Sequence, residues 1–493
     1  MNLDIVRLFE EVVQKKGNNT CVKWNDSYLS YSDLNNKSNQ LAYLLKTKGV
    51  GINDVVGVIC SPSIKFLISV IALLKSGATY FYIDPLLPNE KIDSLVKKSS
   101  LKCLIYDLKF ENKILDNGNV IYIKLDNIDS ELENLPTNNI EGIDYSKANA
   151  WILQTSGTTG EPNLIIHKHD SCVKSLLYEI KNLDLSDNDI HLLKYLVSHR
   201  ELFLPLLSGG IAVIANENMQ FNLNSVIDFI IKEKITVVSF VPSILKILVS
   251  LQEFKLCLNL KHICSGGEGL PFQLVSEILE LLKDVKIYDN YSLSEAFYVF
   301  AKRYYLKNNI IIREKLNSLG NIIIIDDTEN IVRKNHRGEI CISGEGLSLG
   351  YYNNEELTNK KFIRNYSQNE NVLYKTGDWG MFDDDGFLII EGRKDNQIKI
   401  AGNRVELQEI ENAILSYKGI IETAIITKKT SSEDISIVAF INKKDLSLTK
   451  KDILKYLSKK IPNYMIPSEI HFIENIPKTS MGKINYKYLR DNF

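Results

Sequence analysis

Short apolar runs of strand type alternate with segments of helical spacing along most of the chain, and this alternation restricts the fold more than any other feature. Val55–Cys60 and Tyr80–Ile83 predict buried strands, and each is followed by a predicted helix, Ser63–Ser76 and Asn89–Lys98. A chain that alternates in this way builds parallel strands into a sheet with helices on both faces. We therefore expect an α/β fold.

The alternation returns in the middle of the chain and changes after about residue 310. The second series consists of Gly210–Ala215, Ser225–Lys232, Thr236–Phe240 and Pro271–Leu282. Later strands, such as Ile322–Ile325 and Glu339–Ser343, are joined by turns that contain Gly and Asp. This pattern indicates an antiparallel, small β-barrel-like section within a large N-terminal domain.

The length of the chain requires more than one domain. Its 493 residues exceed the ~250–300 at which one hydrophobic core stops growing. The polar stretch Gly392–Asn396 separates two apolar runs, and the chain after it is Lys-rich, with a helix-forming pattern and short strands. We predict an N-terminal core over residues 1–394 and a small, mobile α+β lid domain over residues 395–493.

Charge and cysteine usage exclude several classes of protein. The 59 basic and 61 acidic residues give a net charge of -2, so no basic field favours nucleic acid. The seven cysteines are scattered without a Cys-x-x-Cys motif, which predicts buried, reduced thiols. The chain has no signal-peptide pattern, and no uncharged apolar run reaches the ~18 residues that span a bilayer. We expect a cytoplasmic protein with neither a membrane nor a nucleic-acid partner.

A run of small and hydroxyl residues follows the apolar strand Trp151–Leu153. It consists of Thr155, Ser156, Gly157, Thr158, Thr159 and Gly160. Such residues suit a loop that surrounds an anion with backbone N–H groups and hydroxyls, although a polar surface loop is the alternative. No Gly-Lys-Ser/Thr closes the run, so it is not a Walker loop.

Further motifs stand in a regular order before and after this run. They are Leu29–Leu34, Leu74–Tyr80, Ile83–Pro85, Gly266–Glu268, Asn290–Glu295, Gly338–Ile340, Gly350–Tyr352, Tyr374–Asp378, Gly392–Glu411, Pro462–Pro467 and Met481–Ile484. In content and order this series resembles the adenylate-forming superfamily of acyl-CoA synthetases, luciferases and nonribosomal peptide synthetase adenylation domains. The likeness is strongest to a stand-alone adenylation domain.

The resemblance implies that the chain binds ATP and Mg²⁺. Glu295 matches the Mg²⁺ carboxylate, and Ser294 matches the hydroxyl that meets the α-phosphate. Tyr291 would stack on adenine, and Asp289 would accept a hydrogen bond from the adenine amino group. Enzymes of this superfamily join a carboxylate to the α-phosphate of ATP. Both of these reactants are anions, so the site must offer positive charge and hydrogen-bond donors where negative charge builds up.

The remaining nucleotide contacts follow from the same resemblance. Asp378 would bind the ribose hydroxyls and Arg393 would help to hold the ribose. Thr155–Gly160 would clamp the phosphates, and Gly267 and Glu268 belong to the same cofactor-binding set.

Two residues near the C-terminal domain would act during turnover. Lys483 matches the lysine that bridges the carboxylate and the α-phosphate, a task that suits a compact ammonium group. Asp395 matches the hinge about which the small domain rotates. The alternatives are a solvated lysine and an ordinary linker residue.

The phosphate loop departs from the family pattern immediately after Gly160. The family usually continues through Pro to Lys and Gly, whereas this chain reads Glu161-Pro162-Asn163-Leu164. The missing lysine removes a positive charge near the pyrophosphate. We expect weaker handling of ATP, with His167 or Lys168 as a partial replacement.

The expected substrate pocket also departs from the pattern. Its lining set is Tyr195, Leu196, Val197, Arg200, Ser239, Ile263, Ser265, Asn290, Tyr298 and Val299. Glu201–Leu207 fixes the register, and Leu196 then stands where amino-acid-activating relatives place an Asp for the α-ammonium group. A buried ammonium without a partner is costly, so an acid that lacks an α-amine is favoured, with a β-amino acid still open.

Arg200 falls where an aromatic residue often lines the pocket. One hypothesis is that it recognises a second anionic or hydrogen-bonding group of the substrate. The other is that it pairs with Glu201 or points to solvent.

These observations predict an acid–thiol ligase. It would activate a small or medium carboxylic acid as acyl-AMP, release pyrophosphate, and pass the acyl group to a phosphopantetheinylated carrier protein in trans. We expect this carrier in trans because the chain stops about ten residues after Lys483. A ligase that uses free CoA is the first alternative, and a non-catalytic binding relative is the second.

Overall fold

The structure is a computed structural model, and it divides the chain into two compact units. The described residues are 4–114, 118–155, 162–194, 199–216, 219, 222–316, 319–364, 372–393, 397–400, 402–429, 435–444, 447–478 and 484–493. The first unit comprises Met1–Pro85, Ser99–Leu153 and Leu164–Gly392. The second comprises Leu86–Lys98, Gln154–Asn163 and Arg393–Phe493. Two short segments of the predicted N-terminal domain therefore belong to the same compact unit as the C-terminal part.

A seven-stranded sheet in the first unit has the order β18-β8-β7-β4-β3-β5-β6. Its strands are β3 (Val55–Ile59), β4 (Thr79–Tyr82), β5 (Cys103–Tyr106), β6 (Ile121–Lys124), β7 (Asn149–Thr155), β8 (Asn163–Lys168) and β18 (Gly350–Tyr351). Strands β7, β4, β3, β5 and β6 run parallel, as the alternation in the sequence predicts. β18 closes the edge antiparallel to β8.

A nine-stranded sheet in the same unit has the order β15-β14-β13-β12-β11-β9-β10-β1-β2. Its strands are β1 (Thr20–Trp24), β2 (Ser27–Ser30), β9 (Ile190–Leu193), β10 (Ile211–Ile214), β11 (Val237–Ser239), β12 (His262–Gly266), β13 (Lys286–Leu293), β14 (Ala296–Lys307) and β15 (Ile310–Lys315). The six central strands, β13, β12, β11, β9, β10 and β1 in spatial order, are parallel. Strand β2 at one end and strands β14 and β15 at the other are antiparallel additions.

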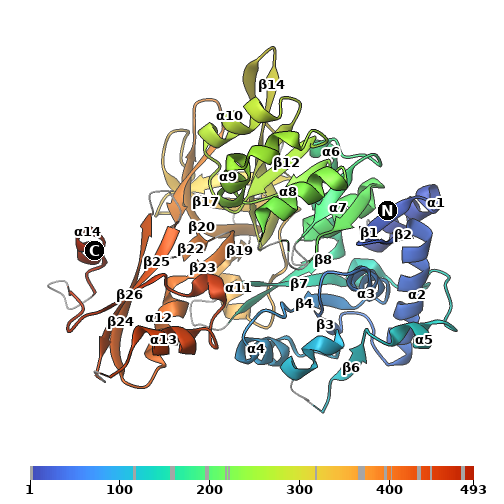
Figure 1. The fold of residues 1–493 in the computed structure, drawn as a ribbon, viewed down its shortest axis with the longest axis horizontal. Coiled ribbons are helices and arrows are strands. Elements are labelled where there is room, and N and C mark those ends of the chain that lie inside the picture. The colour runs from blue at the N-terminus through green and yellow to red at the C-terminus, as the bar shows by residue number, and fades with distance from the viewer. Residues whose placement is uncertain are drawn as a thin grey trace. The chain divides into compact units, whose positions relative to one another are not determined.

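Helices cover both faces of the nine-stranded sheet (Figure 1). One core joins the sheet to α1 (Ile5–Lys16), α2 (Tyr31–Thr47), α3 (Ile64–Lys75), α6 (His169–Leu183) and α7 (His199–Ser208). The other joins it to α8 (Leu223–Lys232), α9 (Pro242–Ser250) and α10 (Phe272–Leu281). Successive side chains of β12 point to opposite faces of the sheet, because Ile263 lies in the second core and Cys264 in the first. A strand that is buried on both faces reads as a continuous apolar run, which explains the pattern in the sequence.

The predicted barrel-like section is a five-stranded sheet. It consists of β16 (Gly320–Ile325), β17 (Gly338–Gly344), β19 (Phe362–Arg364), β20 (Val372–Phe382) and β21 (Leu388–Arg393), with β17 and β20 in the centre. Its pairs β16–β17, β17–β20 and β19–β20 are antiparallel. The first unit also contains the short helices α5 (Ile128–Leu132) and α11 (Glu355–Lys361).

The second unit has an α+β core of its own. Its strands are β22 (Gln397–Ile400), β23 (Asn403–Glu406), β24 (Ile420–Lys429), β25 (Ile435–Lys443) and β26 (Glu469–Phe472). Its helices are α4 (Asn89–Ser99), α12 (Leu407–Leu415), α13 (Lys450–Leu457) and α14 (Tyr486–Asn492). Lys91 of α4 pairs with Glu409 of α12, and Glu90 pairs with Lys460. These ion pairs attach α4 to the C-terminal elements.

The large and small α/β regions confirm the predicted fold class. All seven cysteines are buried and free, as predicted. No helix in the described part of the chain is long and apolar enough to cross a membrane.

Candidate functional site

Predicted site residues of the first unit gather where parallel strands end. β12 ends at Gly266, and β13 ends at Leu293, immediately before Ser294 and Glu295. Ligands of open α/β sheets bind beyond the carboxyl ends of the strands. The fold therefore places these residues at the edge where such a sheet binds ligands.

Glu295 is a buried carboxylate in the turn between β13 and β14. The hydroxyl of Tyr351, on the edge strand β18, donates to its Oε1 at 2.7 Å. Gly350, which precedes Tyr351, has a φ of +121°, and a Cβ there would lie 2.4 Å from Thr358 Cγ2. Glycine is therefore needed for β18 to approach α11, and this approach places the tyrosine against Glu295.

His167 on β8 fixes the same turn through the backbone. Its Nε2 lies 2.8 Å from the carbonyl oxygen of Ser294, so this nitrogen carries the proton and donates. Burial lowers the pKa of His167 to about 4, which the hydrogen bond to Ser294 only partly opposes. His167 is therefore neutral near pH 7 and holds Ser294 and Glu295 in place.

Asp378 and Tyr291 form a second buried pair. The hydroxyl of Tyr291 donates to Asp378 Oδ2 at 2.5 Å, and both side chains are buried. The backbone N–H of Asp378 donates to Thr376 Oγ1 at 2.9 Å, and the Thr376 hydroxyl donates to the carbonyl of Ile340 at 2.7 Å. Strands β13 and β20 thus hold an aromatic ring and a carboxylate at a fixed separation.

The two buried carboxylates fit the Mg²⁺ ion and the ribose hydroxyls that the resemblance implies. Mg²⁺ takes oxygen ligands and is usually held by one or two carboxylates together with substrate phosphates. The buried carboxylate of Glu295 matches this requirement, and the described residues contain no cluster of three or more His, Cys, Asp or Glu side chains suited to a metal. Asp378 supplies two oxygens that can accept from a pair of hydroxyls.

Other predicted nucleotide contacts have local partners. Asp289 pairs with Lys302 at 3.6 Å, and burial raises the pKa of Asp289 while Lys302 lowers it. Glu268 accepts from the backbone N–H of Ser243 at 3.2 Å, in the first turn of α9. Gly267 has a φ of +87°. Arg393 is the last residue of β21.

Arg200 pairs with a residue that the sequence interpretation did not consider. Its guanidinium pairs with Glu179 of α6, and the side chain is 25% exposed whereas Glu179 is 2% exposed. Glu201 instead accepts from Lys194, whose Nζ lies 3.1 Å from Glu201 Oε1. The expected pairing of Arg200 with Glu201 is therefore wrong, because the guanidinium turns toward α6.

Lys194 belongs to the same group of charges. Burial lowers the pKa of this lysine, while Glu201 opposes the shift. Its Nζ also lies 4.7 Å from the ring centroid of Phe240. His199 at the start of α7 stacks on Trp151, with ring centroids 4.1 Å apart, and this contact fixes the helix end that carries Arg200 and Glu201.

Strand register separates the predicted pocket residues onto two faces. Ser239 pairs with Cys264 and Asn290 pairs with Gly266, so Ser239 and Asn290 share the face that packs against α6 and α7. Ile263 and Ser265 point to the opposite face, where Ile263 lies in the core with α8–α10. The structure therefore brings Ser239, Asn290 and Arg200 toward one side and leaves Ile263 and Ser265 on the other.

Asn290 is the most unusual member of this set. It is 7% exposed, and neither of its amide atoms has a hydrogen-bond partner within the described structure. The hydroxyl of Ser265 is also buried without a partner there. Buried polar groups are nearly always paired, so an orphaned amide within β13 marks a place for a ligand group.

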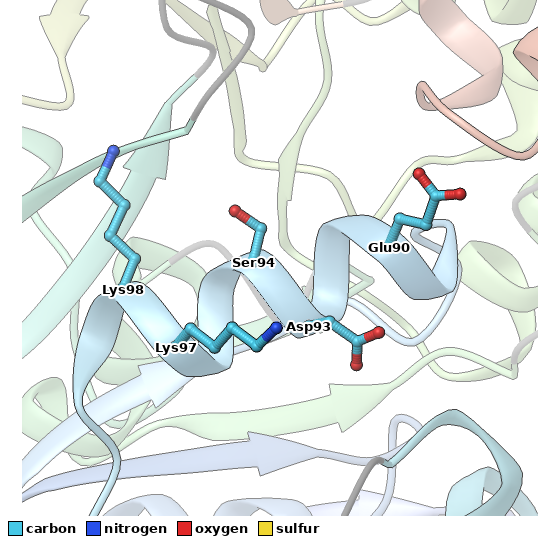
Figure 2. A pocket seen from close by; sticks show the side chains of 5 residues that line it. All are labelled: Glu90, Asp93, Ser94, Lys97 and Lys98. Carbon is cyan, nitrogen blue, oxygen red and sulfur yellow. The ribbon is translucent and has the colours of Figure 1, made fainter.

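The second unit contains Thr155, the described start of the hydroxyl-rich run, and Pro162, which follows the run after Glu161. Thr155 ends β7 in a buried position, and Pro162 precedes β8. Lys98 of α4 donates from Nζ to the carbonyl oxygen of Pro162 at 2.6 Å. Beside it lies a cavity of about 570 Å³, lined by Glu90, Asp93, Ser94, Lys97 and Lys98 (Figure 2).

One of the two predicted replacements for the missing loop lysine, His167, needs correction. His167 cannot supply positive charge near pH 7, because burial lowers its pKa to about 4. Lys168 is exposed at the end of β8, and its role as a replacement stays a prediction. Among the described residues, Lys98 reaches the carbonyl of Pro162, and it is distant in sequence and identified by no local motif.

Several predicted residues lie outside the described residues. They are Ser156, Gly157, Thr158, Thr159, Gly160, Tyr195, Leu196, Val197, Asp395 and Lys483. The strand β14 includes Tyr298 and Val299, but their side chains are not described. The roles of all these residues stay predictions.

The sequence interpretation missed three contributors to the site. Tyr351 lies within a quoted motif without an assigned role, and so does Thr376. Glu179 lies in the middle of an ordinary helix, so nothing short of the packing of α6 on α7 could have identified it.

Family models and curated relatives agree with this geometry. A model described as AMP-binding enzyme matches residues 9–352, and one described as AMP-binding enzyme C-terminal domain matches residues 409–483. Gramicidin S synthase 2 of Brevibacillus brevis is 31% identical over 99% of this chain, which spans only 11% of that protein. Zwittermicin A synthase ZmaJ of Bacillus cereus is 29% identical over 99% of this chain and 95% of its own length.

Solved structures share the fold at lower identity. An artificially fused adenylation–PCP di-domain, NpsA-ThdA from Klebsiella oxytoca, gives a TM-score of 0.83 at 20% identity over 95% of this chain and 94% of that one. The o-succinylbenzoate CoA synthetase MenE of Bacillus subtilis, bound to a product analogue, gives 0.82 at 19% identity over 98% of both chains.

Proposed function

The chain belongs to the AMP-binding enzymes, a family of adenylate-forming ligases, and from this premise we propose that it activates a carboxylic acid with ATP and transfers the acyl group to a carrier-protein thiol. The observation that carries the proposal is the pair of buried carboxylates, Glu295 and Asp378, each held by a tyrosine hydroxyl. A nucleotide site needs carboxylates of this kind for a cation and for ribose hydroxyls.

The reaction has two half-reactions. In the first, an oxygen of the substrate carboxylate forms a bond to the α-phosphorus of ATP, the bond to the bridging oxygen breaks, and pyrophosphate leaves. In the second, the thiol sulfur attacks the acyl carbon, the thiol proton is lost, and AMP leaves. Mg²⁺ would neutralise phosphate charge during the first half-reaction.

The described and predicted site residues have separate tasks in binding and positioning the substrates. Glu295 would supply a carboxylate ligand to Mg²⁺ and Ser294 a hydroxyl to the α-phosphate, while His167 holds both through the Ser294 carbonyl. Asp378 would accept from the ribose hydroxyls, and Tyr291 would lie against adenine. Thr155–Gly160 would bind the phosphates.

The mobile parts of the proposal rest on the sequence. Lys483 would bring an ammonium group to the carboxylate and the α-phosphate, and Asp395 would serve as the hinge that withdraws it. Both lie outside the described residues.

The charges near Arg200 support an acid with an uncharged body. Glu179 neutralises Arg200, and Glu201 neutralises Lys194, so this wall of the proposed pocket carries no net charge. Leu196, where amino-acid-activating relatives place an Asp, leaves an α-ammonium without a partner. The orphaned amide of Asn290 offers both a donor and an acceptor to a hydroxyl or similar group. We propose a small or medium acid of the hydroxy, aryl or keto type.

Pyrophosphate exchange against a library of acids tests the first half-reaction. We expect exchange with hydroxy or aryl acids, and weaker exchange with matched α-amino acids. Exchange with no acid, together with no binding of ATP, would instead support a non-catalytic relative.

A comparison of acceptors tests the second half-reaction. The acid found by exchange is offered with free CoA and, separately, with pantetheinylated carrier proteins. Thioester on a carrier and none on CoA supports the proposal, whereas efficient formation of acyl-CoA would make the chain a CoA ligase.

A further inference from the structure

Strand β13 presents two of the predicted nucleotide contacts on one face of the nine-stranded sheet. Asp289 and Tyr291 are two residues apart, and the pairing of β13 with β14 is regular from Ile287 to Tyr291. Side chains two residues apart on a regular strand point to the same side of the sheet. A base that lies against the Tyr291 ring can therefore turn one edge toward Asp289.

Lys302 of β14 stands directly beside Asp289. The two residues are register partners, and Nζ of Lys302 lies 3.6 Å from Oδ2 of Asp289. Both side chains are only 17% exposed. Their separation exceeds hydrogen-bond distance, so the carboxylate oxygens and the ammonium hydrogens keep capacity for a third group. Arg313 also acts on Asp289 electrostatically, but its guanidinium lies 3.6 Å from the ring centroid of Phe387 and 3.9 Å from Asp383.

A third polar side chain continues this row on β12. Ser265 is the register partner of Asp289 on the side away from Lys302. Its hydroxyl is buried and has no hydrogen-bond partner among the described residues. Since buried hydroxyls are nearly always paired, this one marks room for a ligand group next to the carboxylate. The row thus offers an unused hydroxyl, an acceptor and a charged donor side by side.

We propose that Lys302 is a specificity-determining residue for the nucleotide: Asp289 accepts from the 6-amino group of adenine, and Lys302 donates to a ring nitrogen beside that group. The inference rests on the proposed function, in which Asp289 meets the amino group, and it adds the residue that recognises the neighbouring atom. Lys302 lies outside the sequence motifs and is identified by the pairing of β13 with β14.

The pair distinguishes adenine from purines that carry a 6-keto group. Adenine presents a donor, its amino group, next to an acceptor, a ring nitrogen. A 6-keto purine places an acceptor oxygen against the Asp289 carboxylate, which leaves two acceptors without a donor between them. A site built to hydrogen-bond one group rejects an analogue that lacks it, because the buried polar group stays unpaired. We therefore expect the protein to prefer ATP over GTP and inosine triphosphate.

The test measures nucleotide binding by calorimetry with Mg²⁺ and without an acid. It compares ATP with 1-deaza-ATP and 7-deaza-ATP, each of which has a carbon in place of one of the two ring nitrogens nearest the amino group. We expect the unaltered protein to bind one of these analogues about tenfold more weakly than ATP, as for the loss of one hydrogen bond from a charged donor. Lys302→Met should bind ATP and that analogue equally, and Lys302→Arg should restore the preference.

Lys315 of β15 provides a matched control. It is the register partner of Lys302 on the side away from Asp289, and its Nζ lies 5.8 Å from the ring centroid of Phe300. Lys315→Met removes the same charge from the same row and should keep the full preference for ATP. The preference is a ratio of two affinities within one variant, so partial unfolding of a variant does not change it.

Two results would overturn the inference: a Lys302→Met variant that keeps the preference of the unaltered protein, and an unaltered protein that binds ATP and both analogues equally. Because no acid is needed, the inference and the ligase proposal fail separately. Loss of the preference in Lys302→Met supports the inference even if no acid supports pyrophosphate exchange. Exchange together with an unchanged preference would refute the inference and leave the ligase proposal intact, and an unaltered protein that does not bind ATP would refute both.

Discussion

Two sets of buried carboxylates in the first unit are stabilised in opposite ways. Asp378 and Glu295, on the proposed nucleotide side, accept from tyrosine hydroxyls. Glu179 and Glu201, on the proposed acid side, pair with Arg200 and Lys194. A neutral donor fixes a carboxylate without cancelling its charge, whereas an ion pair cancels it. The nucleotide side thus keeps negative charge for a cation and for ribose, and the acid side presents a neutral wall.

Removing charge on the nucleotide side should have the largest effect. In Glu295→Gln, the amide keeps an acceptor for Tyr351 but loses the negative charge that a metal requires. We expect exchange to fall by roughly 10²–10³-fold, the range for loss of one electrostatic contact in a catalytic site. The assay is pyrophosphate exchange over a range of Mg²⁺ concentrations.

A matched control makes this result specific. Glu314→Gln removes an acidic charge from a partly exposed pair with Arg303, and its exchange rate should stay unchanged. If the Glu295→Gln variant kept full activity at low Mg²⁺, the Glu295 carboxylate would not serve the metal, and the proposed difference between the nucleotide side and the acid side would be refuted.

Breaking an ion pair on the acid side should mainly affect stability and selectivity. Glu179→Gln leaves the Arg200 charge without its carboxylate, and we expect a loss of about 3 kcal/mol in the free energy of unfolding. The double variant Glu179→Gln/Arg200→Met should recover much of that loss. Urea denaturation of the single and double variants measures both values.

The same variant tests the neutral wall. With Glu179 neutralised, Arg200 becomes available to a second carboxylate, so exchange should shift from monoacids toward diacids of equal length. An unchanged ratio of diacid to monoacid would show that Arg200 does not face the substrate.

Buried histidines on both sides predict a common loss of stability in acid. Burial lowers the pKa of His167 to about 4 on the nucleotide side and that of His191, near Arg200, to about 3 on the acid side. An unfolded histidine binds its proton below about pH 6.5, where the folded protein still excludes it. The unfolded state then binds more protons, so stability falls as pH falls from about 6.5 toward 4.

The pH dependence can be assigned to individual residues. Each histidine should contribute on the order of 2 kcal/mol over this window, after allowance for partial burial in the denatured state. His167→Gln and His191→Gln should each flatten the plot of unfolding free energy against pH. A slope that neither substitution changes would assign the acid sensitivity to other groups.

The sequence predicted the fold better than the site because the two depend on different information. Periodicity is local, so the strand predicted at Tyr80–Ile83 and the helix predicted at Ser63–Ser76 were placed to within a residue or two. Contacts between distant segments are not local. Arg200 with Glu179, Lys98 with Pro162 and Glu295 with Tyr351 join residues separated by 21, 64 and 56 positions.

Strand register supplies a second kind of information that sequence motifs lack. Ile263 and Ser265 were grouped with Ser239 and Asn290 from their positions in motifs. One residue of shift in a strand reverses the face, and only the pairing of β11, β12 and β13 shows which residues share a side.

The smallest expected effect distinguishes the two tyrosines of the nucleotide side. Tyr291→Phe keeps the ring but removes the hydroxyl that donates to Asp378 at 2.5 Å. A hydrogen bond to a charged group is worth about 1.5 kcal/mol, so the KM for ATP should rise about tenfold with the KM for the acid unchanged. Tyr351→Phe should instead shift the Mg²⁺ dependence, because its hydroxyl contacts Glu295. If both variants changed the same parameter to the same extent, Asp378 and Glu295 would serve one common contact, and the assignment of ribose to one and metal to the other would have to be abandoned.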